Sequence, residues 1–175
     1  MDGVNRQASN SGLIERQWGM FAYNKEYFWF DAQDIREWPL EIPQECQSLT
    51  ILAADPFTIP VSIRDLVKLK YLTLDLNNEG IEIPAVIGEM TQLEELFISG
   101  TDINHLDLGK LNNLKKLYLF DTGLTEVPRW IRSLTNIRDL SLCNNQIREV
   151  PDWLITLRST VTVDLRNNLL SNLDR

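Results

Sequence analysis

One order of apolar and polar positions recurs along the chain. In residues 140–151, LSLCNNQIREVP, leucines alternate with polar residues, two asparagines follow, and two more apolar residues lead to Pro151. Residues 117–128, LYLFDTGLTEVP, have the same order 23 residues earlier. Because successive side chains of a strand point to opposite sides, Leu140 and Leu142 are expected to point the same way. The pattern predicts a short strand, a corner and a return segment.

This order extends over most of the chain. Seven units of roughly 20–24 residues align from about Lys25 onward, a period typical of repeat architectures. Their strand-forming pairs are Phe28 and Phe30, Leu52 and Ala54, Leu72 and Leu74, Leu96 and Ile98, Leu117 and Leu119, Leu140 and Leu142, and Val163 and Leu165. In this alignment the unit that begins at Leu49 is shortened, and the next unit has one inserted residue. The pattern is broken where Gln33, Phe57, Thr101 and Thr122 replace the corner asparagine and Asp107 replaces the proline.

Stacking gives these units a physical reason to repeat. One short strand cannot bury its apolar edge alone, whereas a row of neighbouring strands buries a continuous core. After the corner, Val-Pro ends the strand, and apolar residues three apart, such as Ile131 and Leu134, favour a helical or 3₁₀ turn. The sequence therefore predicts strands on one side of the stack and short helical segments on the other.

The motif L-x-x-L-x-L-x-x-N-x-L-x-x-L-P-x-x-I-x-x-L, read over residues 25–175, resembles that of the leucine-rich repeat family. It is most similar to the 23-residue intracellular subtype. The resemblance implies an α/β fold, a right-handed solenoid of about seven repeats with a parallel concave sheet and convex 3₁₀ or short helical segments. It also implies that the corner asparagine satisfies backbone groups, each of which would cost about 1–3 kcal/mol if buried unpaired. The function that it implies is non-catalytic binding of a protein partner on the concave face, with no cofactor.

Both ends of the repeat array raise the question of capping, because a solenoid end exposes apolar edges. Residues 1–24 are expected to form an N-terminal cap before a repeat domain at 25–175. Ile14, Trp18 and Phe21 have helical spacing, which favours a short helix, and a hairpin that turns near Asn24 is the alternative. At the other end the chain stops within a unit. The exposed edge there could be covered by self-association or by a further domain, or the charged residues at the end could suffice without a cap.

The residues between the inward pairs form the candidate binding surface. They include the aromatic residues Tyr27, Trp29, Tyr71, Phe97, Tyr118 and Phe120, and the aspartates Asp31, Asp55 and Asp75. Aromatic residues commonly anchor interfaces. The three aspartates are predicted to stack in neighbouring repeats, an arrangement that is unfavourable unless a cation or water meets it. We therefore expect a partner that has a basic patch, and an apolar patch for the middle of the face.

Charge and cysteine content narrow the classes of partner. The formal net charge is −8, which argues against nucleic acid. Residues 1–107 carry 18 acids and 7 bases, a net −11, whereas residues 108–175 carry 7 acids and 10 bases, a net +3. No apolar run is long enough to span a membrane, and no secretory signal is seen, so no membrane partner is expected. Two cysteines favour a reducing, cytoplasmic location, with a secreted effector as the alternative.

Catalytic and metal sites find little support in the residues. His105 is the single histidine, and the calcium-loop-like DLNNEG at 75–80 has Val86 where a bidentate Glu is needed. Cys143 has no neighbouring base to activate it, and Cys46 is expected to fill the convex side. No metal and no enzyme activity are predicted. The alternatives are the recognition half of an effector that resembles leucine-rich repeat ubiquitin ligases, and a structural module that self-associates through its C-terminal end.

Overall fold

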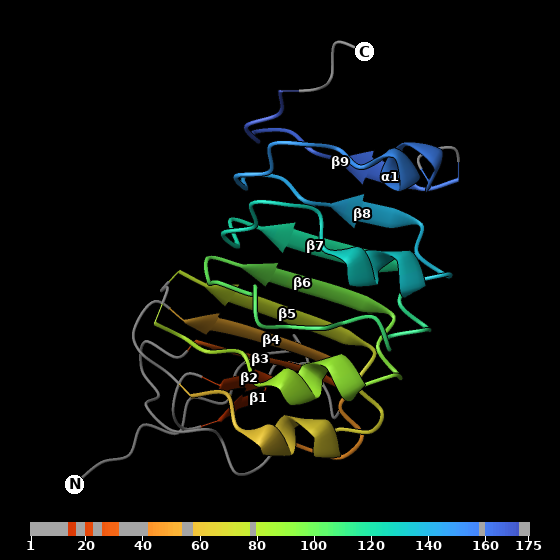
Figure 1. The fold of residues 1–175 in the computed structure, drawn as a ribbon. Helices are drawn as coiled ribbons and strands as arrows, with labels where there is room; N and C mark the ends of the chain where they lie inside the picture. The colour runs from red at the N-terminus through yellow and green to blue at the C-terminus, as the bar shows by residue number, and fades with distance from the viewer. Residues whose placement is uncertain are drawn as a thin grey trace, which may run out of the picture.

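The structure is a computed structural model that describes residues 14–16, 20–22, 26–31, 42–53, 58–77, 80–157 and 160–171. Over these residues the strands form one sheet in which each strand pairs with its neighbours in the sequence. The strands are β1 (Ile14–Arg16), β2 (Met20–Ala22), β3 (Tyr27–Asp31), β4 (Ser48–Ala53), β5 (Tyr71–Leu76), β6 (Glu95–Ser99), β7 (Lys116–Phe120), β8 (Asp139–Ser141) and β9 (Thr162–Asp164). Figure 1 shows them stacked in chain order, with the helices on one side of the stack.

Strands β3 to β9 are parallel, as the repeat predicts. Leu117 pairs with Leu140, and Leu140 pairs with Val163, on adjacent strands. The inward leucines of the other units continue the same row, and nearly all of them are fully buried. Each strand thus adds one rung to a continuous core, and the predicted solenoid is confirmed.

The return segments carry short helices where the prolines predict them. The described residues contain three 3₁₀ helices and one α-helix: η1 (Val61–Asp65), η2 (Ala85–Glu89), η3 (Arg129–Ser133) and α1 (Asp152–Leu157). A proline is the N-cap residue of each 3₁₀ helix, and Pro151 precedes α1. Where Asp107 replaces the proline, the segment from residue 107 to 114 forms turns only. None of the helices in the described ranges is long and apolar enough to cross a bilayer.

The alignment of the second unit was wrong by three residues. Leu49 and Ile51, rather than Leu52 and Ala54, are the inward pair of β4, because they pair with Leu72 and Leu74. Cys46 is fully buried just before β4 and occupies the position that leucine or isoleucine fills in later units. The residues in that position, Cys46, Leu69, Leu93, Leu114 and Ile137, are spaced by 23, 24, 21 and 23 residues. The unit is therefore not shortened, and the short unit is the one that contains Asp107.

At the N-terminal end the described residues are strands. β1 pairs with β2 and β2 pairs with β3, both antiparallel, with Phe21 opposite Trp29. The favoured helix through Ile14 and Phe21 is therefore wrong at these positions, and the pairing of β2 with β3 is that of the alternative hairpin. The antiparallel strands extend the edge of the parallel sheet, which is a way to cover its first strand. The division between residues 24 and 25 stays a prediction.

The paired asparagines of the opening pattern have different tasks. Asn144 has φ +55°, a left-handed conformation that Asp121, Asn167 and Gly100 share at equivalent positions. Asn145 is buried, and its amide nitrogen donates to the carbonyls of Leu119, Leu142 and Cys143 at 2.9–3.1 Å. The first residue therefore turns the backbone, and the second satisfies the groups that the turn exposes.

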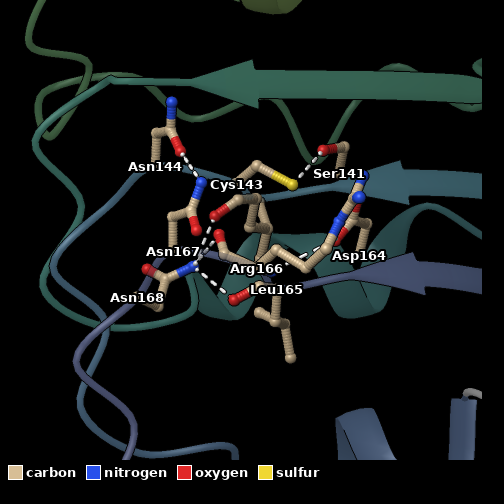
Figure 2. Close-up of polar contacts among 9 residues, drawn as sticks. Ser141, Cys143, Asn144, Asp164, Leu165, Arg166, Asn167 and Asn168 are labelled. Carbon is tan, nitrogen blue, oxygen red and sulfur yellow. Dashed lines mark hydrogen bonds and ion pairs between the residues drawn. The ribbon is translucent and has the colours of Figure 1, made fainter.

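The next unit repeats this ladder of bonds. Asn168 donates to the carbonyls of Leu142 and Leu165, the second of which is seen in Figure 2. The Asn168 side-chain oxygen accepts the backbone N–H of Ile147. Thr101 substitutes with one bond, from its hydroxyl to the carbonyl of Ile81 at 2.6 Å. Asn77 matches the motif but is exposed. Phe57, assigned to this position in the second unit, lies outside the described residues, and the corrected alignment moves the position to Ala54.

Candidate partner-binding face

The candidate site is the side of the sheet that faces away from the core, here called the open face. Strand pairing arranges its positions in three rows across the repeats. The first row is Tyr27, Ser48, Tyr71, Glu95, Lys116, Asp139 and Thr162. The second is Trp29, Thr50, Thr73, Phe97, Tyr118, Ser141 and Asp164. The third is Asp31, Leu52, Asp75, Ser99 and Phe120. Adjacent strands are about 4.8 Å apart, so neighbours in a row can touch.

The corrected register of β4 changes which residues reach this face. Thr50 and Leu52 are half-buried and belong to it, whereas Ile51 and Ala53, which an inward pair of Leu52 and Ala54 would have placed there, are buried. Leu52 lies between Asp31 and Asp75 in the third row. The predicted stack of Asp31, Asp55 and Asp75 is therefore wrong, because an apolar residue fills the middle position. Asp55 itself lies outside the described residues.

The predicted aromatic residues stay on the open face. Tyr27 is 46% exposed and Phe120 is 39% exposed, although both are large. Tyr71, Phe97 and Tyr118 are half-buried. Trp29 has its predicted place in the second row, opposite Thr50. The hydrophobic core is on the other side of the sheet, so the rings of Tyr27, Tyr71, Phe97, Tyr118 and Phe120 are not needed to fill it.

Phe97 and Tyr118 form the centre of the aromatic surface. Their ring centroids are 6.4 Å apart and the rings are tilted by 46°, a spacing typical of favourable aromatic pairs. Partial burial, and to a lesser degree the charge of Asp139, raise the pKa of Tyr118. The tyrosine hydroxyl therefore stays a neutral donor and acceptor at physiological pH.

Charged side chains surround this aromatic centre unevenly. Glu95 and Lys116 are ion-paired at 2.8 Å, and the pairing raises the pKa of Lys116. Asp75 accepts a 2.6 Å hydrogen bond from the Ser99 hydroxyl. Within the described part of the chain, no lysine or arginine forms an ion pair with Asp75. Among the described residues, Asp75 is therefore a carboxylate of the central open face that no cationic side chain neutralises.

A shallow hollow of about 360 Å³ lies on β5, β6 and β7. Its lining is Tyr71, Leu72, Thr73, Asp75, Glu95, Leu96, Phe97 and Tyr118. Leu72 and Leu96 point to the core, so their backbone forms part of the floor. Thr73, which lies between Tyr71 and Asp75 on β5 and beside Phe97 on β6, has a short side chain and leaves space between the rings of Tyr71 and Phe97. The hollow brings four of the predicted partner-binding residues together: Tyr71, Asp75, Phe97 and Tyr118.

Polar residues gather at the C-terminal end of the open face (Figure 2). Arg166 forms a two-pronged ion pair with Asp164, at 2.6–3.0 Å, and with a smaller contribution from the Cys143 thiol it holds the pKa of Asp164 far below its ordinary range. The Ser141 hydroxyl donates to the sulfur of Cys143, which is buried. A buried thiol beside a carboxylate, without a histidine, is not activated as a nucleophile.

The other candidates for catalysis or metal binding, His105 and Cys46, have structural roles. The Nε2 atom of His105 is 2.9 Å from the carbonyl oxygen of Ile83, in the preceding repeat. No group of three or more metal-ligating side chains occurs in the described ranges. Cys46, expected to fill the convex side, is a core residue two positions before β4, and burial raises its thiol pKa to about 12.

The sequence reasoning missed a second ladder, at the edge where the strands begin. Side-chain amides of Gln92, Asn113 and Asn136 donate to the carbonyls of Leu66, Thr91 and Asn112 in the preceding units, at 2.6–3.1 Å. Beside it, Glu94 is held between Lys70 and Lys115, which lower its pKa. The sequence does contain a signal for this ladder, since each of these amide residues directly precedes the first apolar residue of its unit. These contacts join repeats and leave the open face free.

Comparisons with known proteins agree with this geometry. Residues 112–155 match a family model described as Leucine Rich repeats (2 copies). No curated protein sequence matches the chain. Among solved structures, the chain is similar to internalin C2 from Listeria monocytogenes, at 22% identity over 73% of this chain and 53% of that one, with a TM-score of 0.57. That identity supports a shared fold.

Two plant receptors are also similar. The peptide hormone receptor RGFR1, solved in complex with RGF2, is 29% identical, with a TM-score of 0.56. The Arabidopsis receptor kinase HAESA ectodomain, solved with an N-terminally extended IDA peptide hormone, is 29% identical, with a TM-score of 0.54. The matches cover 73% and 74% of this chain but 22% and 24% of the receptor chains. The chain therefore spans about half the length of the internalin and less than a quarter of each receptor.

Proposed function

We propose, from the premise that the chain is a leucine-rich repeat protein, that its open face binds a protein partner and that it carries out no catalysis. The observation that carries the proposal is the group of rings on the side of the sheet opposite the core: Tyr27, Tyr71, Phe97, Tyr118 and Phe120. Exposing large rings is unfavourable in water, and contiguous apolar surface on a soluble domain commonly marks an interaction site. The two receptor structures similar to the chain hold peptide hormones, which supports a protein or peptide ligand here.

Charge supports a partner with a basic patch. Residues 1–107 carry a net charge of −11, and Asp75 on the open face has no cationic partner among the described residues. Complementary charge speeds encounter and selects between partners more than it raises affinity. A basic segment that approaches β3 to β5, followed by an apolar group over Phe97 and Tyr118, would match both features.

A binding role without chemistry is supported by the state of the reactive side chains. His105 is bonded to a backbone carbonyl, and Cys143 is buried beside Asp164. Both cysteines are free, which supports a reducing, cytoplasmic compartment as part of the proposal. Self-association through the C-terminal end stays a prediction, and residues 172–175 lie outside the described ranges.

Affinity capture with three versions of the protein tests the proposal. The wild type, the open-face variant Phe97→Ala/Tyr118→Ala, and the control Val61→Ala/Val67→Ala are immobilised and exposed to extract of the source cells. The control removes two exposed apolar side chains near η1, away from the open face. Proteins identified by mass spectrometry should be retained by the wild type and the control and lost with the open-face variant. Retention of the same proteins by the open-face variant, or their loss with the control, would overturn the proposal.

A further inference from the structure

The hollow on β5, β6 and β7 has walls of two different kinds. Tyr71 and Phe97 present aromatic rings, and Asp75 presents a carboxylate. Tyr71, Thr73 and Asp75 alternate along one strand, so the backbone positions of Tyr71 and Asp75 are about 13 Å apart, with Thr73 midway between them. The short threonine side chain leaves space that the larger side chains around it enclose.

Within the described ranges, the cationic side chains do not balance the charge of Asp75 in the hollow. Glu95 is neutralised by its ion pair with Lys116. Asp75 accepts a hydrogen bond from Ser99 on one oxygen, and its neighbours in the third row are the uncharged Leu52 and Ser99. A serine hydroxyl fixes the orientation of a carboxylate without neutralising it. The hollow therefore offers an oriented negative charge next to aromatic faces.

We propose that this hollow receives one arginine side chain of the protein partner, with the guanidinium bonded to Asp75 and lying against the rings of Tyr71 and Phe97. The inference rests on the proposed function, because it names what the open face recognises. A planar guanidinium donates in several directions while it stacks on an aromatic ring, whereas a lysine ammonium is a compact, strongly hydrated charge. The volume of the hollow, about 360 Å³, lies at the small end of the range for ligand sites, which suits one long side chain.

The neighbouring positions indicate how the rest of the partner would lie. Phe120 extends the aromatic surface along β7, beyond the hollow, and Leu52 adds an apolar side chain over β4. On β7 the first-row residue is Lys116, whose ion pair occupies the Glu95 carboxylate, so a second cation gains no partner there. The arginine is therefore expected within a segment whose flanking residues are apolar or uncharged on the β7 side.

Binding of blocked single amino acids tests the hollow without knowledge of the partner. Nα-acetyl-arginine amide, Nα-acetyl-lysine amide and the neutral Nα-acetyl-citrulline amide are titrated into the protein, and the aromatic signals are followed by NMR. Arginine amide should give saturable shifts at Tyr71, Phe97 and Tyr118. It should bind at least about tenfold more tightly than citrulline amide, and more tightly than lysine amide. Equal binding of arginine and citrulline, or shifts that avoid these rings, would overturn the inference.

Two variants and a matched control give the test its specificity. Asp75→Asn should weaken arginine amide about tenfold or more, because the charge is lost while the shape is kept. Thr73→Tyr should abolish binding by filling the hollow, and tyrosine is well tolerated on a sheet surface. Glu126→Gln removes the same charge at an exposed position before η3, and should leave binding unchanged. Unchanged binding in Asp75→Asn, or an equal loss in Glu126→Gln, would refute the role of Asp75.

The outcome separates this inference from the proposed function. If arginine amide fails to bind while the Phe97→Ala/Tyr118→Ala variant still loses its captured partner, the inference fails and the proposed function stands. If the probe binds but capture does not depend on the open face, the proposed function fails and the hollow is not the recognition site that the inference requires.

Discussion

Replacing Asn145 with alanine tests the claim that a side-chain amide joins two repeats. Asn145 is 6% exposed. Its oxygen accepts the backbone N–H groups of Thr122 and Leu124, at 3.0 and 3.2 Å, and the Thr122 hydroxyl at 3.1 Å. Alanine can accept none of these bonds, and it has no donor for the carbonyls that the Asn145 amide reaches.

The expected loss follows from the number of groups left unpaired. An unsatisfied buried donor costs about 1–3 kcal/mol, so the N–H groups of Thr122 and Leu124 alone give about 2–6 kcal/mol. The carbonyls are left out of this sum because Cys143 also accepts from Asp121, and Leu142 also accepts from Asn168. We therefore expect Asn145→Ala to lower the free energy of unfolding by at least about 2 kcal/mol.

Neighbouring substitutions provide controls for this value. Asn144→Gly keeps the left-handed turn without the side-chain penalty, so it should change stability by less than about 1 kcal/mol. Asn168→Ala should cost less than Asn145→Ala, because Asn168 is only half-buried and water can replace its bonds. Thr122→Val removes one of the three donors to the Asn145 oxygen and should cost about 1 kcal/mol.

Urea unfolding followed by tryptophan fluorescence measures these differences, since the chain has five tryptophans. Amide hydrogen exchange gives a local measurement, because the N–H groups of Thr122 and Leu124 should lose protection in Asn145→Ala more than those of β5. If Asn145→Ala costs no more than Asn144→Gly, or if the two amides keep their protection, the ladder does not hold the repeats together.

Three further predictions concern backbone, pH and thiol chemistry. Gly100→Ala should destabilise the protein more than Gly123→Ala in thermal unfolding. Both glycines have φ +71°, but a Cβ at Gly100 would overlap the carbonyl of Leu76, whereas one at Gly123 meets nothing closer than Asp102. Equal losses of stability would argue against the overlap. Because Arg166 lowers the folded-state pKa of Asp164, this pair stabilises the fold above the ordinary aspartate value of 3.8 and the stabilisation is lost as pH falls through the folded-state pKa. The gap in urea midpoint between wild type and Asp164→Asn should therefore persist from pH 7 to about pH 4 and shrink below it, and a gap that is constant with pH would contradict the assignment. In a Cys143→Ser background, Cys46 should react with a thiol reagent at pH 8 only after unfolding in urea, since burial raises its pKa to about 12, and rapid labelling of the folded protein would show that β4 opens.

The fold was predictable because the inward apolar pairs recur in enough copies that comparing the units fixes their alignment. The exception was β4, and its physical cause is instructive. Cys46 occupies the position where later units have leucine or isoleucine, and Ile51 occupies a leucine position. Leu52 faces outward, so an alignment that matched leucines by residue identity placed Leu52 wrongly. The alternation of Leu49, Ile51 and Ala53 was present in the sequence, and burial follows this alternation rather than the identity of the residues.

The candidate site was predictable in its rows but not in its shape. The sequence placed Tyr71, Phe97 and Tyr118 on the open face, because the strands around them matched the motif well. The hollow depends on the small Thr73 lying beside Phe97 on the next strand, and this requires the register between strands. The same requirement explains why the aspartate stack failed, since an error in one strand exchanged Leu52 for Asp55. The bond from Ser99 to Asp75 depends on side-chain rotamers, which no pattern of positions specifies.

The alternation that builds the core also separates stability from recognition. Along β5, Leu72 and Leu74 are buried, and Tyr71, Thr73 and Asp75 face outward, so a change on the open face removes little of the core packing. The rows of the open face nevertheless exist only because the inward leucines and the corner bonds fix the register of each strand against the next. Each repeat contacts only its neighbours, so an open-face feature made by three strands depends mainly on the two junctions within it. For the hollow these are the junctions of β5 with β6 and of β6 with β7, and Thr101, bonded to Ile81, supports the first of them. Loss of the Asn145 bonds, at the junction of the β7 and β8 repeats, would therefore reduce global stability while the hollow keeps its geometry in the folded protein.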